Sequence, residues 1–159
     1  MRTLVLGIGN TLLTDEGVGV HIIKALSEFL PPGLDGVELL DGGTLSFTLA
    51  GPIEEAETLV VVDAAELKSP PGTLRVFEGE AMDAFLLSNR KSSVHEVGLA
   101  DLRAIAILAG HWPQRRALVA VQPQLLDWGE FPTAAVAAAV PEACRRIVEL
   151  IGAWRDGAQ

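Results

Sequence analysis

Acidic side chains follow three apolar runs of the sequence, each of which is expected to form a buried strand. Glu16 lies in the glycine-rich segment after the first run, Asp41 follows the second, and Asp63 follows the third. In open α/β sheets, ligands bind beyond the carboxyl ends of the strands. A carboxylate at the end of a buried strand is costly unless it is paired or binds a ligand. If the first and third strands are neighbours, we expect Glu16 and Asp63 to meet over a single cation.

A histidine could complete this cation site. His95 lies in a polar stretch ahead of an expected helix, and two carboxylates with one imidazole suit a borderline divalent cation with open coordination positions. The pair His95-Glu96 does not begin a zinc-protease helix motif, because a leucine stands four residues after the histidine. Simpler interpretations stay open, in which Asp63 caps a turn and His95 lies on the surface. Asp15 and Glu16 could simply favour the positive end of a helix.

Other motifs of known chemistry are absent from the sequence or incomplete. The segment 7–12 resembles a dinucleotide-binding turn, but Leu12 replaces the last glycine, and the helix is expected to begin too late, near Asp15. No G-x-S-x-G motif offers a nucleophilic serine. Cys144 lies on the apolar stripe of the last expected helix and is assigned to the core. The two remaining histidines, His21 and His111, are also assigned structural roles.

The elements that must position these residues alternate along the chain. Short runs rich in valine and leucine predict buried strands, and a more alternating run after a Pro-Pro-Gly turn predicts an edge strand at 73–77. The buried strands are expected at 3–8, 37–40, 58–62 and 117–121. Apolar stripes predict helices at 18–30, 99–108 and 133–154, the last one either kinked or restarted at Pro141. This alternation predicts a three-layer α/β/α sandwich on a mostly parallel sheet, as one domain over 1–159.

Composition limits the partners of this domain. The 159 residues carry a formal charge of −9, which argues against nucleic acid or an anionic membrane as the main partner. Residues 1–80 hold 4 basic and 13 acidic side chains, so this half could attract a cation or a basic partner, although solvated surface acids explain most of the excess. The single cysteine, the short apolar start and the lack of a spanning run predict a reduced, cytoplasmic protein.

Five motifs in this order resemble the maturation endopeptidases of nickel–iron hydrogenases. They are GIGNTLLTDEGVG at 7–19, LLDGGT at 39–44, VVVDA at 60–64, HEVGLADL at 95–102 and VAVQP at 119–123. The resemblance covers about residues 1–123 and implies a five-stranded sheet with one antiparallel strand, for which 73–77 is the natural candidate. It also implies a protease that removes the C-terminal extension of the hydrogenase large-subunit precursor after nickel insertion.

The resemblance implies roles for particular residues as well. Glu16, Asp63 and His95 match the metal-contacting positions of the family, and the nickel would be supplied by the precursor rather than held by the isolated enzyme. Either carboxylate could serve as general base, as in an aspartic-type endopeptidase. We assign the segment 41–44 to backbone contact with the extended peptide, with a plain turn as the alternative; its residues are Asp41, Gly42, Gly43 and Thr44. The protein is expected to act as a monomer.

Three positions depart from the family pattern at the rim of this site. Ser46 replaces a common glycine, Val94 a common proline, and Gln124 a common acid, which affects substrate preference more than activity. Two other functions remain open at this point. One is a maturation chaperone that binds metal without catalysis, and the other is a related α/β hydrolase with an unrelated substrate.

Overall fold

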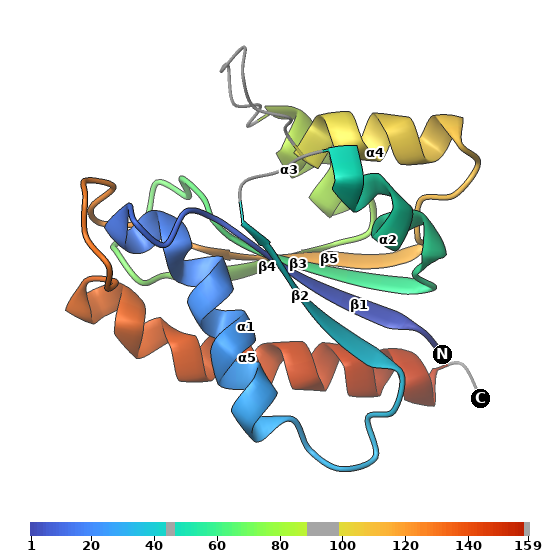
Figure 1. Cartoon of the computed structure of the whole chain (residues 1–159), viewed down its shortest axis with the longest axis horizontal. Coiled ribbons are helices and arrows are strands. Elements are labelled where there is room, and N and C mark those ends of the chain that lie inside the picture. Colours follow the sequence, from blue (N-terminus) through green and yellow to red (C-terminus); the bar gives the residue numbers. More distant parts are fainter. Residues whose placement is uncertain (44–46, 89–98, 158–159) are drawn as a thin grey trace.

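A five-stranded sheet forms the centre of the molecule. The computed structural model describes residues 1–43, 47–88 and 99–157. The strands follow the order β2-β1-β3-β5-β4 across the sheet (Figure 1). Their bounds are β1 Thr3–Ile8, β2 Val37–Gly43, β3 Thr58–Ala64, β4 Leu74–Glu78 and β5 Arg115–Val121.

Helices cover both faces of this sheet. In Figure 1, α1 (Val18–Phe29) and α5 (Ala134–Asp156) lie on one face. The other face carries α2 (Ala50–Glu55), α3 (Glu80–Ser88) and α4 (Leu99–Leu108). The short 3-10 helices η1 (Thr14–Gly17) and η2 (Phe47–Leu49) precede α1 and α2. The predicted three-layer α/β/α sandwich is therefore confirmed.

The pairing of the strands also follows the prediction. β1 pairs in parallel with β2 on one side and with β3 on the other, and β3 pairs in parallel with β5. β4 pairs antiparallel with β5 at the edge of the sheet. The first and third strands are thus neighbours, as the proposed meeting of Glu16 and Asp63 requires, and the strand expected at 73–77 is the antiparallel one.

Alternation along β3 divides the core in two. Every residue of β3 is buried, because helices cover both faces. Leu59 and Val61 pack with α2, α3 and α4, whereas Val60 and Val62 pack with α1 and α5. Since successive side chains of a strand point to opposite faces, Asp63 points toward the layer of α2, α3 and α4.

Several elements differ from the sequence-based expectation. β2 continues to Gly43 and β3 to Ala64, so Asp41 and Asp63 lie inside strands and not after them. α5 continues through Pro141 without a restart, although the proline cannot donate the usual hydrogen bond. The sequence analysis missed α2 and α3, which have six and nine residues. In the part of the chain that the structure describes, no helix has the length and apolarity needed to cross a membrane.

Candidate active site at the carboxyl edge of the sheet

Glycines bring the first helix onto the carboxyl ends of the central strands. A Cβ atom on Gly19 would lie 2.3 Å from the carbonyl oxygen of Val62 and 2.5 Å from that of Ile8. Gly9 has φ +139°, and a Cβ there would lie 1.9 Å from the carbonyl oxygen of Glu16. Only glycine permits such close approach of two backbones. The glycine spacing of segment 7–19 is therefore explained by packing and not by a bound dinucleotide.

This packing brings the short helix that carries Glu16 against β3. Glu16 is half-buried in η1, and its backbone N–H donates a hydrogen bond of 3.0 Å to the carbonyl of Leu13. η1 lies in contact with β3, whose penultimate residue is Asp63. Asp63 is only 8% exposed. The structure thus brings two of the three predicted metal-contacting residues to the same edge of the sheet.

The third predicted residue, His95, lies outside the described residues. The helices on either side of it in the chain, α3 and α4, belong to the layer toward which Asp63 points. Among the described residues, no three cysteine, histidine or acidic side chains form a group that could hold a metal ion. The three-residue site of Glu16, Asp63 and His95 therefore stays a prediction.

The predicted peptide-binding segment forms the end of the edge strand β2. Asp41 accepts a 2.8 Å hydrogen bond from the N–H of Gly43, which has φ +51°. The register with β1 shifts between Gly7 and Ile8, so Gly42 has no direct partner on β1. Among the described strands, β2 pairs only with β1, and its other edge is available for backbone contact. Thr44, Ser46 and Val94 lie outside the described residues.

Asp15 has a structural role that the sequence analysis missed. Its carboxylate is fully buried and accepts hydrogen bonds from the N–H groups of Gln124, Leu125 and Thr133 at 2.7–3.0 Å. The hydroxyl of Thr133 donates to the same carboxylate. Burial alone would raise the pKa of Asp15, but these hydrogen bonds outweigh it and lower the pKa. Asp15 therefore fixes the loop after β5 against η1; no local sequence signal links residues over 100 positions apart.

The residues assigned to structural roles behave accordingly. Cys144 packs with the α1–α5 core, and burial raises the pKa of its thiol, which disfavours the nucleophilic thiolate. His111 Nε2 lies 2.8 Å from the carbonyl oxygen of Ala56. His21 lies on α1, where burial, with a smaller contribution from Lys24, lowers its pKa.

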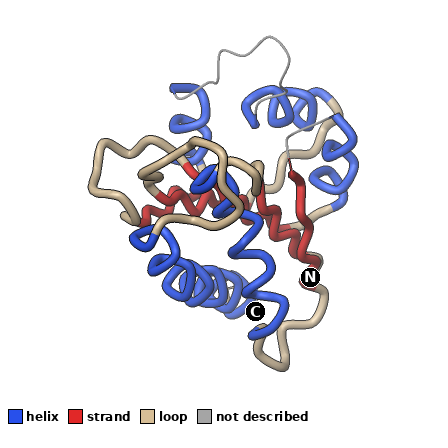
Figure 2. Tube along the Cα trace, turned by 60° about the vertical axis from the view of Figure 1, so that its left-hand side comes forward, coloured by secondary structure: helices blue, strands red, loops and turns tan. Residues whose placement is uncertain are grey.

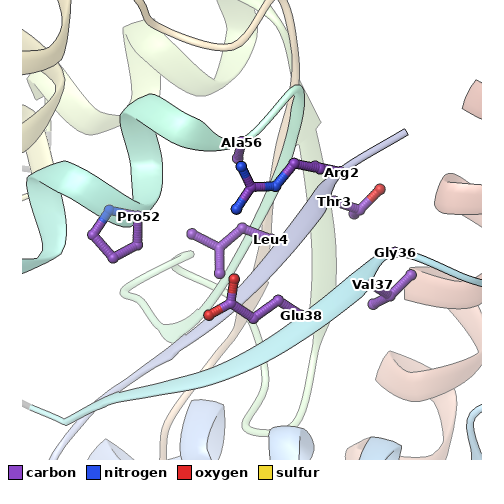
Figure 3. A pocket seen from close by; sticks show the side chains of 8 residues that line it. All are labelled: Arg2, Thr3, Leu4, Gly36, Val37, Glu38, Pro52 and Ala56. Carbon is purple, nitrogen blue, oxygen red and sulfur yellow. The ribbon is translucent and has the colours of Figure 1, made fainter.

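A pocket of about 220 Å³ lies at the other end of the strands, which we call the amino edge of the sheet. Figure 3 shows Arg2 and Glu38 around Leu4, with Pro52 across from them. These residues surround the amino ends of β1 and β2. The pocket is therefore separate from the carboxyl edge, where Figure 2 brings the loops after the strands forward.

The fold and the acidic carboxyl edge define an α/β/α domain with a candidate hydrolytic or metal-recognising site. A family model for hydrogenase maturation protease (HycI) matches residues 20–150. The chain belongs to this family. The expectation of an endopeptidase is thereby confirmed.

Relatives with known sequences and structures agree with this assignment. Hydrogenase expression/formation protein HupD of Rhizobium leguminosarum bv. viciae is 37% identical, over 96% of this chain and 75% of that protein. Hydrogenase 2 maturation protease of Escherichia coli is 41% identical, over 80% of this chain and 76% of that protein. The structure of the hydrogenase maturating endopeptidase HybD from E. coli superposes with a TM-score of 0.84 at 37% identity, covering 99% of this chain and 94% of that one.

Proposed function

We propose that this protease removes the C-terminal extension of the large-subunit precursor of a nickel–iron hydrogenase, after nickel has been inserted. The observation that carries the proposal is the placement of Glu16 and Asp63 at one edge of the sheet in a member of the maturation protease family. The nickel belongs to the precursor and is therefore part of the substrate. An unloaded precursor would offer no ion to bind, so cleavage would follow metal insertion.

Peptide cleavage at the carboxyl edge needs side chains that contact the metal ion and a general base. Glu16 and Asp63 supply two carboxylates, and we propose His95 as the third metal contact. A divalent ion with open positions polarises a carbonyl group and lowers the pKa of a bound water. One of the two carboxylates then acts as general base toward that water. The outer edge of β2 at Asp41–Gly43, which no other described strand pairs with, supports backbone contact with the extended peptide on its way to the site.

The test compares variants on nickel-loaded precursor, with the intact mass of the precursor as the readout. Glu16→Gln and Asp63→Asn keep the side-chain shape and remove the negative charge. We expect each to lower the initial rate about 100-fold or more, the range of a lost general base. Glu57→Gln is the matched control, because Glu57 is exposed at the amino edge.

Two outcomes would contradict the proposal. Full activity of both variants would exclude a role for these carboxylates. A wild-type protein that retains the precursor in a complex without shortening it would be a maturation chaperone instead. Cytoplasmic location and a monomeric state stay predictions from the sequence.

A further inference from the structure

Five large exposed apolar side chains belong to two neighbouring segments beside the candidate site. The loop between β5 and α5 exposes Leu125, Leu126, Trp128 and Phe131, and Leu12 is exposed on the neighbouring segment. Trp128 is 78% exposed and Phe131 76%. We call these five residues the apolar rim. They are half of the exposed large hydrophobic residues in the described parts of the chain. Apolar groups concentrated in this way typically mark an interaction site.

Backbone pairing joins the two segments of the rim. The N–H of Gly129 donates a 2.9 Å hydrogen bond to the carbonyl of Leu12, and the N–H of Thr14 donates one of 2.9 Å to the carbonyl of Gly129. Leu13 and Gly129 form a parallel bridge. In Figure 1 the orange loop after β5 stands beside the blue segment that leads into α1. The two segments of the rim are therefore held side by side through their backbones.

The rim is also held in a fixed conformation. The buried carboxylate of Asp15 binds both ends of the loop, at Gln124–Leu125 and at Thr133. The hydroxyl of Thr14 donates a 2.6 Å hydrogen bond to the carbonyl of Asp127, and Thr14 itself has φ +51°. A threonine in this conformation costs free energy, which surrounding contacts must offset. A preorganised surface loses less conformational entropy when a partner binds.

The rim adjoins the candidate site through consecutive residues. Asp15 anchors the loop, and Glu16 follows it in η1, which contacts β3, the strand that carries Asp63. A partner whose peptide is cut at this site comes within reach of the neighbouring surface. Asp127 and Glu130 are exposed between the apolar residues, so the rim is apolar with negative charge.

We propose that the apolar rim is the docking surface for the folded body of the large-subunit precursor, which would contact it through an apolar patch bearing basic side chains. This inference rests on the proposed function, because continuity with the candidate site identifies the precursor as the occupant. Trp128 and Phe131 are the expected energetic centre, since aromatic residues dominate protein interfaces.

The experiment measures the Kd of nickel-loaded precursor for the full chain, and in parallel kcat and KM for its cleavage. The double variant Trp128→Ser/Phe131→Ser should weaken binding at least tenfold and raise KM correspondingly, with kcat changed less than twofold. The matched control is Phe29→Ser/Leu108→Ser, because Phe29 and Leu108 are also exposed but belong to the ends of α1 and α4. Circular dichroism checks that each variant is folded. If the double variant does not fold, the single variant Phe131→Ser takes its place.

The outcomes separate this inference from the proposed function. Equal Kd for the double variant and the wild type overturns the docking surface, even if cleavage proceeds normally. If the wild type is a dimer, the double variant is a monomer and both bind the precursor with the same Kd, the rim is a contact between copies of this chain and not a docking surface for the precursor. If the wild type binds the precursor but does not cut it, the proposed function fails, and the ratio of the two Kd values still decides the role of the rim.

Discussion

The two edges of the sheet are built differently. At the carboxyl edge, a fully buried carboxylate organises η1 and the loop after β5 through hydrogen bonds to backbone N–H groups. At the amino edge, Arg2 and Glu55 form an ion pair of 3.5 Å whose side chains are 63% and 67% exposed. Buried and satisfied polar groups specify a unique conformation, whereas exposed ion pairs add little. The comparison shows that the carboxyl edge, at which we propose the active site, is the more firmly organised of the two.

Among substitutions at the two edges, Gly19→Ala is expected to have the largest effect on stability. The new Cβ would overlap the backbone of both β1 and β3, so we expect a loss of about 3 kcal/mol in the free energy of unfolding and a loss of cleavage. Urea denaturation measures the first and the precursor assay the second. In Gly152→Ala, the control on α5, a Cβ meets no atom within 4 Å. Equal stability of Gly19→Ala and the wild type would show that α1 does not depend on this close approach.

Asp15→Asn should have the next largest effect. The new amide group would place a donor against the N–H groups that now donate to the carboxylate, and we expect a loss of about 2 kcal/mol. Because the loop carries Trp128, the tryptophan fluorescence should change together with the stability. Asp127→Asn, an exposed change in the same loop, should leave both unchanged. Identical denaturation curves for Asp15→Asn and the wild type would show that the carboxylate of Asp15 does not hold the loop in place.

The pH dependence of stability isolates the charge of Asp15. Its pKa is lower in the folded protein than the usual value near 4, so its charged form stabilises the fold above that value. This contribution is lost as the pH falls through the lowered pKa. Asp83, whose pKa is also lowered, contributes in the same direction in both proteins. Below pH 4, the wild type should therefore lose more stability than Asp15→Asn in urea denaturation. Parallel pH profiles for the two proteins would contradict the assignment.

The smallest effect is expected at the amino edge. Arg2→Ala removes the exposed ion pair with Glu55 and should change the free energy of unfolding by about 0.5 kcal/mol or less. Precursor cleavage should stay at the wild-type rate, because Arg2 lies at the far ends of the strands. Reduced cleavage with unchanged stability would show that the amino-edge pocket takes part in substrate binding.

The sequence predicted the sheet well because local patterns determine it. Apolar runs such as 3–8 and 58–62 indicate strands covered on both faces, and the alternating run near 73–77 indicates the edge strand. The end of β2 was harder to predict, because Asp41, Gly42 and Gly43 favour turns, and the pairing of Asp41 and Gly43 with β1 keeps this segment in the strand.

The candidate site was predictable only in part. The ends of the strands identified Glu16 and Asp63, since topology alone brings such residues to one edge. The role of Asp15 was not predictable, because its partners lie more than 100 residues away in the chain. The exposure of Trp128 and Phe131 depends on the same distant contacts, so no local sequence pattern pointed to the rim.

Our main proposal is that this protease acts at its carboxyl edge on precursor that already contains nickel. Its most direct test is the intact mass of the precursor after incubation with the purified wild-type protein, with and without bound nickel. We predict the loss of one C-terminal peptide from the nickel-loaded form and an unchanged mass for the nickel-free form. Equal cleavage of both forms would contradict recognition of the metal, and no cleavage of either would contradict the proposed substrate.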